Sequence, residues 1–224
     1  MSEKQGKDAG AMDDDAAVLR GMTQFVRESA EKLPEPARSQ TLEVIDFRTS
    51  LTIETDRGAA LMAAAFMDDK LKHALAGRLV DNRKLVTKAL EFNGALGTFS
   101  SRIDFAFLLG LIPKNAHKDL HTIRKIRNAF AHDAKPMSFD DDSIGKLCET
   151  LSFHGVKPAA APASKFRRSV MGLLSFINEV ISSGKHIEPV EDYEIPDRSE
   201  AYKIFSATYE KFTGKEYPLK HEHE

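Results

Sequence analysis

The sequence predicts an all-α protein. Apolar side chains recur at three- and four-residue spacing along most of the chain, as on the buried face of a helix. No segment shows a convincing alternation of apolar and polar residues, which is the pattern of a half-buried strand. Proline, glycine and capping residues divide the chain into pieces of helical length. With 224 residues, 42% of them hydrophobic, the chain can bury one substantial core.

The first half of the chain predicts four helices behind a flexible tail. Residues 1–11 are small and polar and form the expected tail. Ala, Leu and Met are abundant in 56–80, and small side chains favour close packing of a central helix. A glycine-bearing turn with capping residues follows at 94–100. The expected helices cover about 18–26, a segment beginning at Leu42, 56–80 and 101–109.

The second half predicts four more helices, interrupted by a linker or surface loop. The small, proline-rich stretch 154–165 is the best internal boundary. We therefore expect a helical bundle over 12–153, additional C-terminal helices within 166–213, and a tail over 214–224. The expected helices run from about Asn115 to His132, from Ser138 to about Phe153, over 166–181 and over 198–212.

Composition excludes several classes of protein. The formal net charge of −2 argues against a chain that coats nucleic acid by bulk charge. Cys148 is the only cysteine, so no intrachain disulfide can form, and the N-terminus lacks the apolar core of a signal peptide. The longest apolar run, 59–67, is far shorter than the roughly 20 residues that span a bilayer. We expect a cytoplasmic protein without a membrane segment.

The hexapeptide 127–132 is the strongest candidate site. It places a permanent cation, Arg127, beside the amide of Asn128 and five residues before the imidazole of His132. His132 falls in the last turn of its expected helix, where the helix dipole favours an imidazolium ion. Such a set of side chains can stabilise a phosphate and transfer a proton.

Helix geometry sets a condition on this site. On an ideal helix, Arg127 and His132 point about 140° apart. The pair can meet only if the helix ends before His132, or if a second copy contributes its own pair across an isologous dimer interface. The alternative is structural: Arg127 pairs with a carboxylate of a neighbouring helix, so that its removal destabilises the fold. The candidate carboxylates are Glu54, Asp56 and Asp104.

The pattern Arg-Asn-x-x-x-His at the end of a helix resembles the motif of the HEPN superfamily, whose members include metal-independent ribonucleases and inactive relatives. In active members the resemblance implies acid or base chemistry by His132 on the ribose 2′-hydroxyl or the leaving oxygen. Arg127 would stabilise the phosphate, and Asn128 would orient the site. The superfamily often pairs two motifs at a dimer interface, which implies a homodimer. Its ribonuclease members imply an RNA substrate.

A longer resemblance covers about residues 50–153 and points to the MltR family, named for the mannitol operon repressor. Four motifs carry it in the same order: Asp56–Gly58, Leu96–Ile103, Leu109–Ile112 and Asp119–His132. This resemblance implies a regulatory protein on an HEPN-like helical bundle, acting through a protein partner or nucleic acid. The alternative is a metal-independent endoribonuclease, a toxin or defence effector, that uses Arg127 and His132.

Other side-chain groups favour structural interpretations, and we expect no metal and no cofactor. His117 and His121 have the spacing of two metal ligands, but no third ligand is evident, so we expect them on a solvated helix face. Cys148 lies in an apolar helix and is expected to be a packed thiol. The remaining candidates are assigned to helix capping, solvated surface and a terminal tail: Asp140–Asp142, Lys165 with Arg167 and Arg168, and His221–Glu224.

Overall fold

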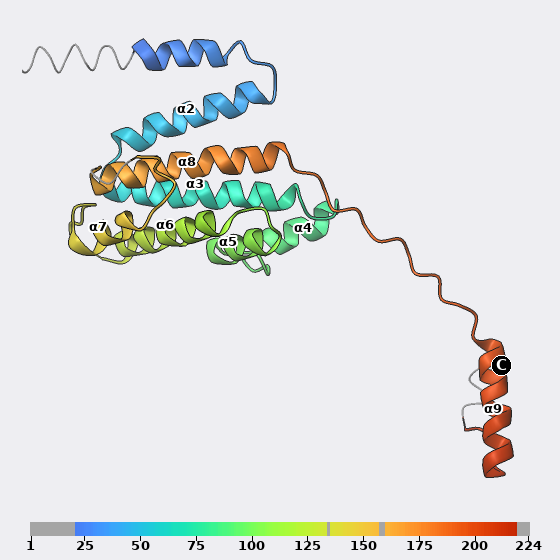
Figure 1. The fold of residues 1–224 in the computed structure, drawn as a ribbon. Coiled ribbons are helices and arrows are strands. Elements are labelled where there is room, and N and C mark those ends of the chain that lie inside the picture. The colour runs from blue at the N-terminus through green and yellow to red at the C-terminus, as the bar shows by residue number, and fades with distance from the viewer. Residues whose placement is uncertain (1–20, 134, 157–159, 219–224) are drawn as a thin grey trace, which may run out of the picture. The chain divides into compact units, whose positions relative to one another are not determined.

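The computed structural model describes residues 21–133, 135–156 and 160–218, and these are helical without a strand (Figure 1). The all-α prediction is therefore confirmed. A helical stretch covers 21–30, while the tail predicted at 1–11 lies outside the described residues. The other helices are α2 (Ala37–Ile53), α3 (Asp56–Ala76), α4 (Arg83–Leu90), α5 (Phe99–Leu108), α6 (Lys114–His132), α7 (Asp142–Glu149), α8 (Pro162–Ser182) and α9 (Ser199–Thr213).

The chain divides into two compact units, Met1–Glu188 and Pro189–Glu224. In the first unit the chain after α8 is tied to the turn after α3, because the Ile187 amide donates to the Arg78 carbonyl at 2.9 Å. The described residues of the proline-rich stretch 154–165 belong to this unit, and α8, which begins within the stretch at Pro162, packs on α3. Within the described residues, no helix combines the length and hydropathy that a membrane span requires.

Helix α3 lies at the centre of the first unit and packs against α5, α6 and α8 (Figure 1). The sequence explains this position, because alanines on one stripe let neighbouring helices approach closely. The predicted stripe is buried throughout: Ala60, Ala63, Ala64, Met67, Leu71, Ala74 and Leu75. The predicted apolar face of α6 is also confirmed, since Leu120, Ile123, Ile126 and Phe130 are fully buried against this core.

The turn between α4 and α5 requires glycine at two positions. A Cβ atom on Gly97 would lie 2.2 Å from the Phe92 carbonyl oxygen, and one on Gly94 would lie 2.3 Å from that of Ala89. Thr98 then begins α5 by accepting the Ser101 amide, in a reciprocal capping box. The predicted turn with its cap is confirmed, whereas α4 itself was not predicted.

Two buried polar side chains fix the elements around α5, α6 and α7. Arg102 of α5 donates to Asp68 of α3 at 2.6 Å and to the Leu90 carbonyl at the end of α4 at 2.8 Å. Asp119 of α6 accepts the backbone amides of Ser152 at 2.7 Å and Phe153 at 2.9 Å. Each contact joins segments that are distant in sequence, so both side chains stabilise the packing of the bundle.

Helix α7 is shorter than the helix predicted over 138–153. Its first residue is Asp142, because Ser138 enters a turn in which its amide donates to the Asp141 carboxylate at 3.1 Å. Its last residue is Glu149, because Asp119 draws the following amides away from helical hydrogen bonding. The predicted helix was therefore wrong at both ends, where side-chain acceptors compete with the helix.

The basic residues at the start of α8 are structural rather than a solvated cluster. Lys165 is buried and pairs with Glu149 of α7. Arg167 donates to the carbonyls of Leu51 and Glu54 at the end of α2, at 3.1 and 3.3 Å. These contacts correct the solvated-surface prediction for both side chains and hold α8 against its neighbours.

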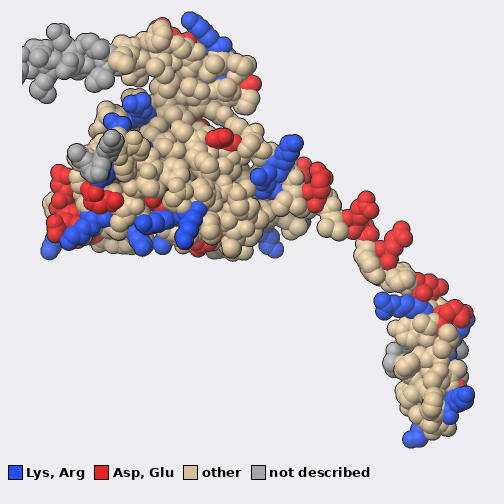
Figure 2. All heavy atoms as spheres, in the orientation of Figure 1, with Lys and Arg blue, Asp and Glu red and all other residues tan. Residues whose placement is uncertain are grey.

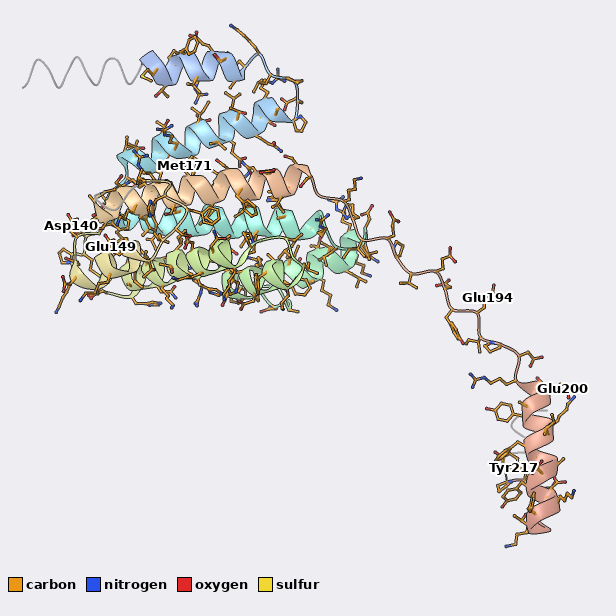
Figure 3. The ribbon with its side chains drawn as sticks, viewed as in Figure 1. Asp140, Glu149, Met171, Glu194, Glu200 and Tyr217 are labelled. Atoms are coloured by element: carbon orange, nitrogen blue, oxygen red, sulfur yellow. The ribbon has the colours of Figure 1, made fainter. Side chains whose placement is uncertain are left out.

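Within the second unit, the described residues 189–198 are extended and lead into α9. No residue of α9 is buried. Gly214 ends the helix in the left-handed conformation, with φ of 65°, which glycine adopts without strain. Tyr217 then folds back, and its ring lies 5.4 Å from that of Phe205 and 5.5 Å from that of Tyr209 (Figure 3).

Candidate functional site

The predicted motif Arg127, Asn128 and His132 lies in the last two turns of α6. The helix continues through His132, and Asp133 is its C-cap. The helix therefore does not end early, and the first of the two routes by which Arg127 could meet His132 is not realised. Within one chain, the ideal-helix separation of about 140° applies to this pair.

Arg127 is exposed and makes no described ion pair. Its Nη1 donates to the Asn128 side-chain oxygen at 2.9 Å. Two of the carboxylates proposed as its partners are engaged elsewhere: Asp56 accepts the Phe139 amide at 3.0 Å, and Asp104 bonds to two histidines. The structural interpretation of Arg127 as a buried ion-pair partner was wrong, and its guanidinium is accessible to a ligand.

The end of α6 is held in place by the start of α3. Arg57 donates from Nη2 to the carbonyl of Asp133 at 2.8 Å and to that of Lys135 at 2.9 Å. Helix ends leave carbonyl groups without helical partners, and a cationic donor satisfies them well. Together with Asp56, Arg57 fixes the chain immediately after His132. The motif Asp56–Gly58 therefore positions the chain that follows α6, a role that the sequence alone did not indicate.

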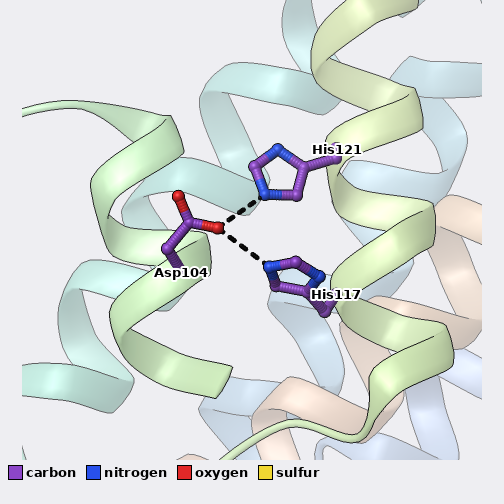
Figure 4. A group of neighbouring side chains, drawn as sticks. All are labelled: Asp104, His117 and His121. Carbon is purple, nitrogen blue, oxygen red and sulfur yellow. Dashed lines mark hydrogen bonds and ion pairs between the residues drawn. The ribbon is translucent and has the colours of Figure 1, made fainter. Parts of the chain in front are cut away.

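A second cluster joins Asp104 of α5 to His117 and His121 of α6 (Figure 4). The Nε2 atoms of both histidines lie 2.8 Å from the same carboxylate oxygen, Oδ1. The histidines are one turn apart on the helix, so they approach the carboxylate from the same face. The solvated helix face predicted for the two histidines was wrong, since both imidazoles are largely covered. The third member of the cluster was missed because Asp104 belongs to another helix.

The cluster is charged and only partly shielded from water. Hydrogen bonds from His117 and then His121 hold the pKa of Asp104 below its usual value, because they stabilise the carboxylate form. The Asp104 side chain is 53% exposed, whereas the two imidazoles are largely covered. The Phe107 ring lies 4.8 Å from the His117 ring and covers one side of the cluster.

Cys148 is a buried thiol of the core, as predicted. Burial, followed by the nearby charges of Glu149 and Asp56, raises its pKa to about 12. A thiol with such a pKa carries almost no thiolate at neutral pH and is a poor nucleophile. Cys148 therefore has a packing role.

The second unit presents an aromatic helix face next to an acidic segment. Tyr202, Phe205, Tyr209 and Phe212 recur on one side of α9 at three- and four-residue spacing. Phe205 is 56% exposed and Phe212 is 83% exposed. Figure 2 shows acidic atoms along the extended segment, and Glu194 of this segment is labelled in Figure 3. Residues 189–197 contain four acids and no lysine or arginine.

The first unit also has an apolar surface of its own. A groove with a volume of about 580 Å³ lies between the helical stretch 21–30 and α2, lined by Met22, Val26, Ile45 and Ile53 among others. Phe25 on the same stretch is 69% exposed. This exposed apolar surface of the first unit can serve as a control for the aromatic face of α9 in binding experiments.

Comparisons with known proteins leave the family open. No family model matches the chain, and no curated protein matches it. A chain in the X-ray structure of the MtlR–HPr complex from Escherichia coli is similar over 61% of this chain and 97% of that chain, with 18% sequence identity and a TM-score of 0.47. A likeness of this strength assigns no function, and the resemblance to the MltR family stays a prediction.

Proposed function

We propose that this chain is a regulatory protein that acts by binding another protein, through α9 and the acidic segment before it. The observation that carries the proposal is the aromatic face of α9, none of whose residues is buried. An isolated helix of this length is only marginally stable in water. A partner groove would cover the aromatic face and stabilise the helix, which is a common mode of peptide recognition.

The chemistry of the partner follows from the residues around α9. Val190, Tyr193 and Ile195 are exposed between the acidic residues of the extended segment. A complementary surface has an apolar groove with a basic rim. A buried aromatic side chain contributes about 150–250 Å². Four aromatic residues and three apolar residues therefore offer an area on the order of the 800 Å² that each partner buries in a standard interface.

The proposal is tested by affinity measurements on the full chain. The immobilised protein is used to capture partners, and the captured protein is then purified and titrated against each variant. Phe205→Ser with Phe212→Ser removes two aromatic anchors, and loss of one such anchor costs about 2 kcal/mol, or roughly 30-fold in Kd. Raising the salt concentration should also weaken binding, because it screens the acidic segment.

Phe25→Ser is the control, since it removes an aromatic ring of the first unit whose exposure, 69%, lies between those of Phe205 and Phe212. We expect this variant to bind the partner with unchanged affinity. Equal affinity of the α9 double variant and the wild-type protein would contradict the proposal. Selective loss of affinity in Phe25→Ser would assign binding to the first unit instead. Analytical ultracentrifugation of the protein alone shows whether a second copy of this chain covers the aromatic face of α9, because the protein would then sediment as a dimer.

A second candidate function is a metal-independent ribonuclease. It is favoured by the accessibility of Arg127, which is exposed and has no described acidic partner for its charge. Arg127 and Asn128 would bind a phosphate, and His132 would transfer a proton. Because α6 stays helical through His132, the site would need the motif of a second copy in a homodimer.

This candidate is tested by incubating the purified protein with RNA in the presence of a chelator. Cleavage should occur, and His132→Ala and Arg127→Ala should each abolish it. His73→Ala, which replaces another exposed histidine, is the control that should keep full activity. Absence of cleavage, or cleavage that persists in His132→Ala, would rule out this function.

A further inference from the structure

We propose that Asp104, His117 and His121 form a binding site for a divalent metal ion of the zinc class. The ligand atoms of the three side chains lie within 4.8 Å of one another. Two imidazoles and one carboxylate are a recurring set of protein ligands for Zn²⁺, with a fourth position left for water or another ligand. This inference is independent of the proposed binding role of α9.

The donor set selects the type of metal. Two imidazole nitrogens favour Zn²⁺, Co²⁺ or Ni²⁺, whereas Mg²⁺ and Ca²⁺ prefer oxygen ligands throughout. The carboxylate adds one negative charge, which attracts a cation to the site. The donor set therefore favours a transition metal over Mg²⁺ or Ca²⁺.

All three side chains must adjust to bind one metal ion. Zinc bonds of about 2.0–2.1 Å to nitrogen and oxygen place tetrahedral ligand atoms about 3.3 Å apart. The Nε2 atoms now lie 2.8 Å from Oδ1, so the carboxylate must move away from the imidazoles by about 0.5 Å. Asp104 is half exposed, and its side chain has room for this movement. Both His–Asp distances are 2.8 Å, so the 4.8 Å span of the set lies between the two imidazoles, which must also turn toward each other to reach the separation of about 3.3 Å. Side-chain rotation supplies this movement while the backbone of α6 stays in place.

The proton balance is also favourable. In the hydrogen-bonded arrangement, each Nε2 carries the proton that it donates to Asp104. Metal binding through Nε2 needs the other tautomer, in which the proton is on Nδ1. Among the described residues, neither Nδ1 atom has a hydrogen-bond partner, so each can carry the proton. The metal bonds then replace the two hydrogen bonds from Nε2 to Asp104.

The Phe107 ring completes the surroundings of the site. Its ring centroid lies 4.8 Å from that of the His117 ring. The His117 and His121 rings lie edge to face at 4.6 Å, which keeps both Nε2 atoms directed at Asp104 (Figure 4). Packing of the rings narrows the range of orientations that must be ordered when a metal binds.

The test uses the full chain after treatment with a chelator that is then removed. Co²⁺ is titrated and followed by its visible absorption, and Zn²⁺ is titrated by calorimetry. We expect one equivalent of either metal per chain and a rise in Tm with Zn²⁺. Asp104→Asn, His117→Gln and His121→Gln should each weaken binding by at least about 100-fold, since even loss of an outer partner of a metal ligand costs 10- to 100-fold.

The chain offers its own control for adventitious binding. His221 and His223 near the C-terminus can chelate metal without a built site. The double variant His221→Gln with His223→Gln should keep the full affinity. Loss of binding in that variant, or binding that survives Asp104→Asn, would overturn the proposal, as would a wild-type protein that binds no metal.

A second readout covers variants that fail to fold. In the wild-type protein, Zn²⁺ should shift the imidazole NMR signals of His117 and His121 and leave that of His73 unchanged. Equal shifts at all three histidines would mean non-specific binding and would reject the site.

Discussion

Two arginines of the bundle, Arg102 and Arg127, predict very different effects on stability when each is replaced by alanine. Arg102 is 7% exposed and donates two hydrogen bonds, to the Asp68 carboxylate and to the Leu90 carbonyl. Arg127 is exposed and donates to its neighbour Asn128. Both substitutions remove an arginine side chain from the same bundle. The difference between their effects on the free energy of unfolding therefore measures the contribution of burial and of the hydrogen bonds that Arg102 makes.

The expected magnitude follows from the groups that Arg102→Ala leaves behind. Removing one partner of a buried ion pair costs about 3–5 kcal/mol. The Asp68 side chain is 30% exposed and regains water, so we expect the lower end, about 3 kcal/mol. For a chain of this size, 1 kcal/mol changes Tm by about 2–4 °C, which gives a decrease of about 6–12 °C. Arg127→Ala should stay within about 0.5 kcal/mol, or 2 °C.

Thermal unfolding followed by circular dichroism measures both values, and urea unfolding supplies the free energies. Arg102→Met is a useful third variant, because it keeps an apolar stem and separates lost packing from lost hydrogen bonds. Equal decreases in Tm for Arg102→Ala and Arg127→Ala would refute the reasoning. A decrease of several degrees for Arg127→Ala alone would contradict the small contribution to stability expected from its exposed position.

Three further predictions concern the turn before α5, the buried carboxylate of Asp119 and the buried thiol of Cys148. Gly97→Ala should destabilise the fold by about 1–3 kcal/mol in urea unfolding, because its Cβ would meet the Phe92 carbonyl. Gly21→Ala is the control, which should be neutral or stabilising because open space surrounds that position. Asp119→Ala should lower the free energy of unfolding by about 3 kcal/mol, since it leaves two loop amides unpaired. Cys148 should resist thiol reagents at pH 8 until the protein unfolds. Its pKa is raised from 9.0 to about 12, so between these values the unfolded chain loses the thiol proton while the folded protein keeps it. The free energy of unfolding should therefore fall as pH rises through that interval.

Local sequence patterns were sufficient for the central helices. The alanine stripe of α3 and the apolar face of α6 were predicted residue by residue, because burial on a helix follows its 3.6-residue period. The end of α6 at His132 was also predicted, since Pro136 prevents the helix from continuing. These features depend on residues that are close together in the chain.

Contacts between distant segments could not be predicted in the same way. Asp104 joins His117 and His121 only because α5 packs beside α6, and nothing in the spacing of the histidines indicates that neighbour. The shortening of α7 depends on Asp119, which lies on another helix. The helix period places Arg127 at the edge of the apolar face, where burial and exposure are both compatible with the pattern.

The role proposed for α9 is tested most directly by amide hydrogen exchange of the full chain, with and without the purified partner. A helix without buried side chains opens readily, so the amides of α9 should exchange fast in the protein alone, while those of α3 and α6 are protected. Addition of the partner should slow exchange in α9 and leave the helical stretch 21–30 unchanged. Exchange in α9 that is equally fast with and without the partner would contradict the proposed function.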